Sequence, residues 1–209
     1  MAFRLYTYAL THDTGFAPCY DNGEYTLACC KPNLRVNLFN DPEDDVWVMG
    51  YWRVRGDEVY PVFVAKIERV LRLEEYYDSG LYETRSDCIY RNVTSLTQAK
   101  RVREMVDIRT LYPTWSPKPD RPDGAPHKDD AYAKADLYGN CVLYSGTFAH
   151  FPQFEVDMPG ILLPLTRNNR DFRKYPKEDD SCNPMARQAL EALLLSDKRE
   201  SEIRPWGNK

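Results

Sequence analysis

A histidine and an aspartate stand side by side between Leu10 and Pro18, and this pair is the best candidate for proton transfer. A histidine titrates near neutral pH, and a carboxylate beside it can orient and charge its ring. Adjacent side chains on a strand point apart, so His12 and Asp13 act together only where the chain bends, and Gly15 makes a bend easy. The alternative is a surface turn capped by Asp13. We predict His12 and Asp13 as catalytic residues.

Positive side chains follow within about two dozen residues, a spacing that brings them into one short span. Lys31 stands between Cys30 and Pro32, where an ammonium group at a strand end can bind a phosphate or a carboxylate. Arg35 is expected to bind the same anionic group. Cys30 would be a nucleophile if Lys31 lowered its pKa, although a buried, inert thiol is the commoner state of a cysteine.

Aromatic residues and a later arginine pair complete the predicted ligand-binding set. Phe16 is expected to be exposed in the loop that holds the histidine, and Trp47 and Trp52 lie on opposite faces of one apolar strand. One face of that strand must belong to the core, and the other can stack a flipped base. Arg167 and Arg170 follow an apolar run, and arginine forks recognise phosphate well.

The composition limits the kinds of partner that the protein can bind. The chain has 209 residues, a formal net charge of -4 and 15 tyrosines. An acidic balance disfavours general binding to duplex DNA, whereas tyrosine faces suit binding surfaces. The cysteines form no C-x-x-C pair and predict neither a metal site nor a disulfide, and no signal peptide or membrane span is expected, so we predict a cytoplasmic protein. These cysteines are Cys19, Cys29, Cys30, Cys88, Cys141 and Cys182.

Elements that position these residues follow from hydrophobic spacing and turn residues. The predicted strands cover residues 3–10, 25–30, 46–52, 59–70 and 141–145, the predicted helices 73–77, 95–111 and 184–197, and a proline-rich surface loop 113–128. Many short strands with a few helices predict a single α+β domain over 1–209, built on a mixed or barrel-like sheet.

Several motifs carry a family resemblance. They are Asp13-Thr14-Gly15-Phe16-Ala17-Pro18, Cys29-Cys30-Lys31-Pro32, Asp45-Val46-Trp47-Val48-Met49-Gly50 and Cys141-Val142-Leu143-Tyr144-Ser145-Gly146. In this order they resemble the second family of nucleotide-modification-associated domains, over roughly residues 3 to 170. Members are found mainly in bacteria and phages, and the resemblance implies a link to DNA base hypermodification without a defined reaction or cofactor.

The chain departs from that family pattern in three places. Cys19 follows Pro18 where an Asn-Pro-Phe type of turn is expected, Asp44-Asp45 replaces a Gly-Asp pair, and Asn168 or Asn169 replaces a histidine. The strand order also resembles the small PUA and EVE barrels that bind modified bases, a likeness of fold alone.

Three functions fit these observations. The first is a base-modification enzyme or its subunit, which uses His12 and Asp13 on a nucleotide or base held in an aromatic, locally basic cleft. The second is a non-catalytic reader of a modified base, of the PUA or EVE type. The third is a protein–protein adaptor, working with other DNA-modification proteins. For the first two, the 12–18 loop and the Lys31-Pro32 turn are expected to line one cleft.

Overall fold

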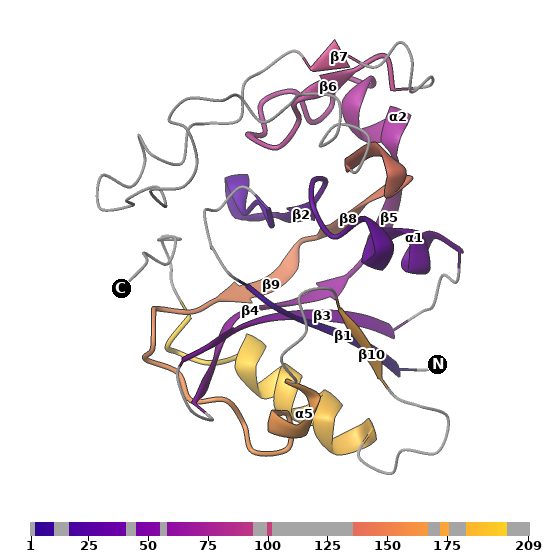
Figure 1. Ribbon diagram of the computed structural model, residues 1–209. Coiled ribbons are helices and arrows are strands. Elements are labelled where there is room, and N and C mark those ends of the chain that lie inside the picture. The colour runs from indigo at the N-terminus through magenta and orange to yellow at the C-terminus, as the bar shows by residue number, and fades with distance from the viewer. Residues whose placement is uncertain are drawn as a thin grey trace, which may run out of the picture.

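Two sheets stacked through a tyrosine-rich core form the centre of the protein (Figure 1). The computed structural model describes residues 3–10, 17–40, 45–54, 58–93, 100–101, 136–166, 172–175 and 183–199. The larger sheet has the order β10-β1-β3-β4-β9, with β1 (Phe3–Ala9) and β3 (Asp45–Arg53) parallel and the other pairs antiparallel. Its remaining strands are β4 (Val59–Ile67), β9 (Thr147–His150) and β10 (Arg173–Tyr175).

The second sheet has the order β2-β8-β5 and lies over one face of the first. It consists of β2 (Tyr25–Leu27), β8 (Cys141–Ser145) and β5 (Arg69–Arg72), all antiparallel, and β6 (Tyr90–Arg91) pairs with β7 (Lys100–Arg101) further out. None of these sheets closes into a barrel within the described residues. The α+β class with a mixed sheet is therefore confirmed, and the barrel-like alternative is not.

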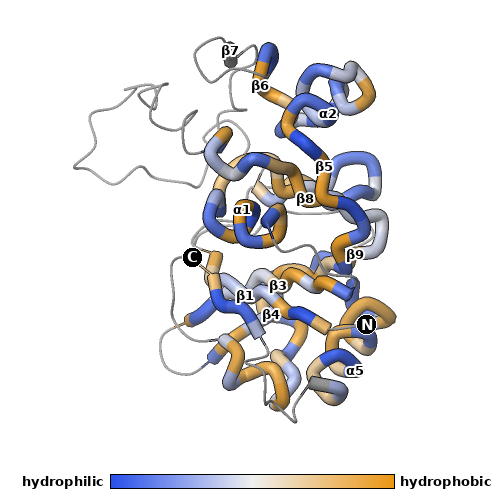
Figure 2. The backbone as a smooth tube through the Cα atoms, turned by 90° about the vertical axis from the view of Figure 1, so that its right-hand side faces the viewer, coloured by the Kyte–Doolittle hydropathy of each residue, from blue (hydrophilic) through white to orange (hydrophobic). Residues whose placement is uncertain are grey.

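Among the described residues, helices α1, α2 and α5 pack against the sheets. α1 (Pro32–Asn40) lies on the inner face of the large sheet, α5 (Asn183–Leu194) on its opposite face, and α2 (Leu73–Tyr77) beyond the small sheet (Figures 1 and 2). Because β1 and β3 are parallel, they need a crossover connection, and α1 lies within it. None of the helices in the described part of the chain is long and apolar enough to cross a membrane.

The strand β3 reads as a continuous apolar run because both of its faces are covered. Val46 and Val48 enter the inter-sheet core, with Tyr6, Tyr8, Leu34, Phe63 and Leu143. Trp47 and Met49 enter the core under α5, with Leu5, Val64, Phe151 and Leu190. A Cβ atom at Gly50 would lie 2.1 Å from the Phe63 ring, so glycine at this position leaves the room that the ring occupies.

Several predicted boundaries were wrong. The run 25–30 is a strand only to Leu27, and a helix that the sequence did not indicate begins at Pro32. The run 59–70 divides at Glu68, where the chain passes from the large sheet to the small one. Residues 100–101 form a strand inside the predicted helix 95–111, whereas the rest of that helix and the loop 113–128 lie outside the described residues. The short helix from Leu73 and the strand β8 are confirmed.

Candidate functional site at the Cys29–Pro32 turn

The turn between β2 and α1 has an unusual backbone. Cys30 and Lys31 both adopt left-handed conformations, with φ angles of 61° and 43°. Side-chain-bearing residues rarely adopt this region, and two in succession persist only where the surroundings hold them. Pro32 then opens α1, a position that suits proline because no helical partner exists for its nitrogen. The turn is therefore a held conformation and not a relaxed loop.

Two charged side chains hold this turn through the backbone of one residue. The Cys30 amide donates to Asp136 Oδ1 at 2.8 Å, and Arg35 Nε donates to the Cys30 carbonyl at 3.0 Å. The Arg35 amide also donates to the Lys31 carbonyl at 3.2 Å. Hydrogen bonds with one charged partner are about twice as strong as neutral ones. The turn is thus fixed on its amide side and on its carbonyl side.

Arg35 itself is fully buried, which corrects its predicted role in binding an anion. Its two terminal nitrogens donate to the carbonyls of Cys141, at 2.7 Å, and Asp136, at 2.5 Å. Gly139 lies against the guanidinium: a Cβ atom there would stand 2.3 Å from Arg35 Cζ. The Arg35 side chain therefore ties α1 to the chain before β8, and its charge faces carbonyl oxygens inside the protein.

Lys31 is half-buried at the end of this turn and reaches back to β1. Its Nζ lies 4.7 Å from the centroid of the Tyr8 ring, within cation–π range. Tyr8 lies near the end of β1, which ends at Ala9. The described residues end at Leu10, and the segment with His12 follows. The structure thus places Lys31 against the strand that leads into the predicted loop, while the loop residues themselves lie outside the described residues.

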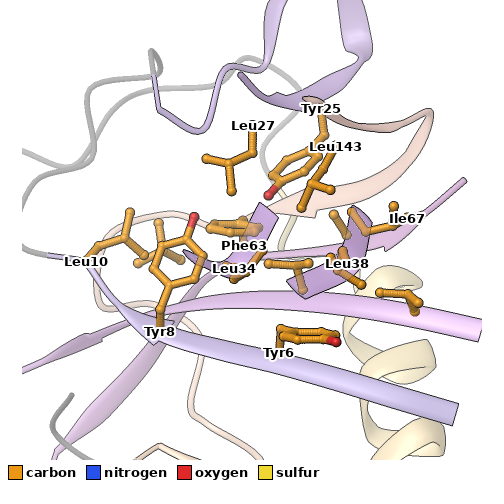
Figure 3. Close-up of a cluster of buried hydrophobic side chains, with 14 of the residues drawn as sticks. Tyr6, Tyr8, Leu10, Tyr25, Leu27, Leu34, Leu38, Phe63, Ile67 and Leu143 are labelled. Atoms are coloured by element: carbon orange, nitrogen blue, oxygen red, sulfur yellow. The ribbon is translucent and has the colours of Figure 1, made fainter. Parts of the chain in front are cut away.

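Tyr8 belongs to a group of rings that we call the tyrosine cluster: Tyr8, Tyr20, Tyr25, Phe63, Phe148 and His150. Figure 3 shows Tyr8 and Tyr25 approaching from the two sheets on either side of Phe63. Ring centroids in the cluster are 4.9 to 6.4 Å apart. Burial raises the pKa of Tyr25 well above its ordinary value, and a contact with Tyr8 lowers it only in part. All rings of the cluster are buried except Phe148, which is partly buried, so Lys31 lies at the edge of a packed core.

Of the two tryptophans predicted to bind a base, one is buried in the core and the other is partly buried. Trp47 is buried under α5, and its indole nitrogen donates to Asp45 Oδ1 at 3.0 Å. Its predicted stacking role is therefore wrong, because both faces of β3 are covered. Trp52 is half-buried against the inter-sheet core. The other predicted residues, His12, Asp13, Phe16, Arg167 and Arg170, lie outside the described residues.

The Cys30 thiol is exposed, but its surroundings do not activate it. Desolvation of the thiolate and the carboxylate of Asp136 raise the pKa of Cys30, and the positive charges of Arg35 and Lys31 do not outweigh them. A thiolate is the nucleophilic form of cysteine. Cys30 is thus a poorer nucleophile than an ordinary thiol, contrary to the hypothesis that Lys31 activates it. In the part of the chain that the structure describes, no three His, Cys, Asp or Glu side chains gather to hold a metal ion.

Sequence reasoning missed Tyr8 and Asp136, which complete the site. Asp136 lies shortly before β8: its Oδ1 accepts a hydrogen bond from the Cys30 amide, and its Oδ2 accepts one from the Tyr90 hydroxyl at 2.8 Å. Only the fold brings Asp136 to a residue 106 positions earlier. Tyr8 stood among alternating strand residues without any local signal.

Comparison with models of protein families identifies a match. The family model described as nucleotide modification associated domain 2 matches residues 2–194, which include the turn, Tyr8 and Asp136. Neither a curated protein nor a solved structure matches the chain.

Proposed function

Because the chain belongs to the nucleotide modification associated domain 2 family, we propose that it binds a nucleotide or a modified base at the Lys31 turn in the course of nucleotide modification. The family name carries the association with nucleotide modification. The observation that supports this particular site is the ammonium group of Lys31, held by a strained turn against the ring of Tyr8.

The chemistry of a nucleotide matches the two halves of this site. A phosphate needs a cation, and Lys31 supplies one at the end of a fixed turn. A base needs a flat face, and we assign this role to the half-buried Trp52, because the tyrosine cluster is buried in the core. Stacking of a base on an aromatic ring contributes about 1–3 kcal/mol. With a net charge of -4, the chain is suited to a single nucleotide or an extruded base and not to a long duplex.

Catalytic roles in this proposal fall to the histidine and aspartate of the 12–18 loop. His12 transfers a proton and Asp13 orients its ring, while Phe16 and Trp52 contact the base and Arg167 and Arg170 contact phosphate. Support comes from the position of Tyr8, one residue before the end of β1 at Ala9, since the described residues end at Leu10, directly before this loop. A reader without catalysis is the second candidate, since stacking on Trp52 and an ion pair with Lys31 would bind a nucleotide without a catalytic group.

Calorimetric titration with deoxynucleoside monophosphates, and with plain and modified oligonucleotides at two salt concentrations, tests the binding proposal. We expect weak, salt-sensitive binding of monophosphates and little binding of plain duplex. Lys31→Ala should weaken binding about fivefold and flatten its salt dependence. Lys66→Ala is the matched control, because Lys66 also lies over an aromatic ring, that of Trp47, at 6.0 Å.

Two outcomes would contradict the proposal: tight binding of plain duplex, or no binding of any nucleotide. To distinguish an enzyme from a reader, the nucleotide is recovered after the titration and its mass is measured by mass spectrometry. An altered mass that disappears in His12→Ala supports the enzyme, whereas an unaltered nucleotide that His12→Ala still binds supports the reader.

A further inference from the structure

We infer that Arg35 and Asp136 are positioning residues that fix the Lys31 ammonium over Tyr8 and so make the site select a phosphate-bearing nucleotide over the bare nucleoside. This inference deepens the proposed function and rests on it for its ligand. It identifies two buried groups that never touch the ligand and act through the backbone of the Cys29–Pro32 turn.

The first step is that the turn needs external support. Left-handed backbone is unfavourable for an ordinary residue, and the turn has it at both Cys30 and Lys31. In an unsupported turn these residues would relax toward the common regions, and a backbone rotation at Lys31 would swing its side chain away from Tyr8. The contact at 4.7 Å therefore depends on whatever holds the turn.

The second step is that the support is specific to Cys30. Asp136 accepts the amide proton of this residue and Arg35 donates to its carbonyl, at 2.8 and 3.0 Å. These two groups are themselves fixed: Arg35 by the carbonyls of Asp136 and Cys141, and Asp136 by the hydroxyl of Tyr90. Both are buried, so the clamp is shielded from solvent. We call these two side chains the turn clamp.

The third step is the consequence for the ligand. A lysine on a free surface loop would meet a phosphate in many geometries and lose side-chain entropy on doing so. A lysine set in advance over Tyr8 meets an anionic group at one place, beside the tyrosine cluster. The clamp should therefore increase the difference in affinity between a monophosphate and its nucleoside, which lacks the anionic group.

The test uses Asp136→Asn, with Tyr90→Phe as the matched control. Tyr90→Phe removes a hydrogen bond to the same carboxylate, but to Oδ2, the oxygen that does not hold Cys30. The full chain is reductively methylated with carbon-13, and the dimethyl-lysine signal of Lys31 is assigned by its absence in Lys31→Arg. A methyl group above a tyrosine ring has a displaced resonance, so this signal reports the position of Lys31 without any ligand.

We expect Asp136→Asn to move the Lys31 signal toward the position of ordinary exposed lysines, and Tyr90→Phe to leave it in place. An unmoved signal in a folded Asp136→Asn protein overturns the inference, and so does an equal movement in both variants. Should Asp136→Asn fail to fold, Gly139→Ala, which crowds the Arg35 guanidinium, is measured in its place.

Affinity gives the second readout, with deoxycytidine monophosphate and deoxycytidine as probes. Asp136→Asn should weaken the monophosphate about fivefold and leave deoxycytidine unchanged. Combining it with Lys31→Ala should weaken binding no further than Lys31→Ala alone, because both changes remove one interaction. Additive losses overturn the positioning role. If wild type binds neither probe while the Lys31 signal still moves, the proposed function fails and the positioning of Lys31 stands.

Discussion

Among the described residues two arginines are buried, and their charges are stabilised in different ways. Arg35, under the Cys29–Pro32 turn, faces the carbonyls of Cys30, Asp136 and Cys141. Arg85, in the segment after α2, lies 3.7 Å from the buried carboxylate of Asp87 and 3.1 Å from the partly exposed carboxylate of Glu24. It also donates to the carbonyls of Asp21 and Glu24 and to the hydroxyl of Thr26. The Arg35 guanidinium thus donates to backbone carbonyls, whereas Arg85 has carboxylates beside it as well as carbonyl and hydroxyl oxygens.

The networks around Arg85 and Arg35 have different structural roles. Asp87 accepts hydrogen bonds from Thr26, at 2.6 Å, and from Tyr76, at 2.5 Å, and so ties β2 to α2 deep in the protein. Asp136 instead accepts, at one oxygen, a hydrogen bond from a single backbone amide, that of Cys30 in the surface turn. Both networks join elements, since Arg35 ties α1 to the chain before β8, but the Arg35 network in addition sets the shape of one turn. Disruption of the first should cost mostly stability, and disruption of the second mostly geometry at Lys31.

The largest expected effect is that of Asp87→Asn. It leaves the positive charge of Arg85 without its buried carboxylate, and breaking a buried pair on one side costs about 3–5 kcal/mol. Asp136→Asn keeps the carbonyl partners of Arg35 and should cost only about 1–3 kcal/mol. Urea unfolding of both variants, with midpoint and slope compared, measures the difference. Equal losses in the free energy of unfolding would show that the two networks do not differ in their contribution to stability.

A smaller effect is expected from crowding the carbonyl-bound arginine. In Gly139→Ala the new methyl group would stand 2.3 Å from Arg35 Cζ, so side chain or backbone must shift, at a cost of about 1–3 kcal/mol. Gly160→Ala is the control, because no atom lies within 4 Å of its added Cβ, and its effect should stay within about 0.5 kcal/mol. Thermal unfolding of both variants checks this. A Gly139→Ala protein as stable as the control would mean that Arg35 is loosely packed.

The sequence predicted the elements whose pattern is local. β3 was predicted from its near-continuous apolar sequence, and α5 from the helical spacing of Met185, Leu190, Leu193 and Leu194. Leu190 and Leu193 are buried, whereas Met185 is exposed. The helix α1 was missed because Leu34, Val36 and Leu38 alternate as they would in a strand. Its helical state is set by Pro32 and by packing on the large sheet.

The candidate site was predictable only in part for the same reason. Lys31 was singled out because a lysine before proline at a strand end is a local signal. The burial of Arg35 was not, because its partners at Asp136 and Cys141 lie about a hundred residues away and meet it only in the fold. The closeness of Arg35 and Lys31 in sequence predicted a shared anion site. In the fold, Arg35 is buried and donates to backbone carbonyls instead.

The smallest expected effect concerns the two thiols that adjoin the networks. Arg85 donates to Cys19 Sγ at 3.6 Å, yet burial and then the carboxylate of Asp87 raise the pKa of Cys19 to about 12. Cys30, at the other network, is exposed and has a pKa raised above its ordinary value. Iodoacetamide should therefore alkylate Cys30 in the folded protein, slowly at neutral pH and faster as the pH rises, and should spare Cys19 until the protein unfolds.

The direction of two substitutions sharpens this test. The carboxylate of Asp136 raises the pKa of Cys30 and the ammonium of Lys31 lowers it. Asp136→Asn should therefore shift the pH midpoint of alkylation downward, because the thiolate loses a negative neighbour, and Lys31→Ala should shift it upward. Peptide mass mapping across a pH series measures both midpoints. Rapid alkylation of wild-type Cys30 at neutral pH would contradict the raised pKa and restore an activated thiol at the turn, because only a thiolate reacts at that rate.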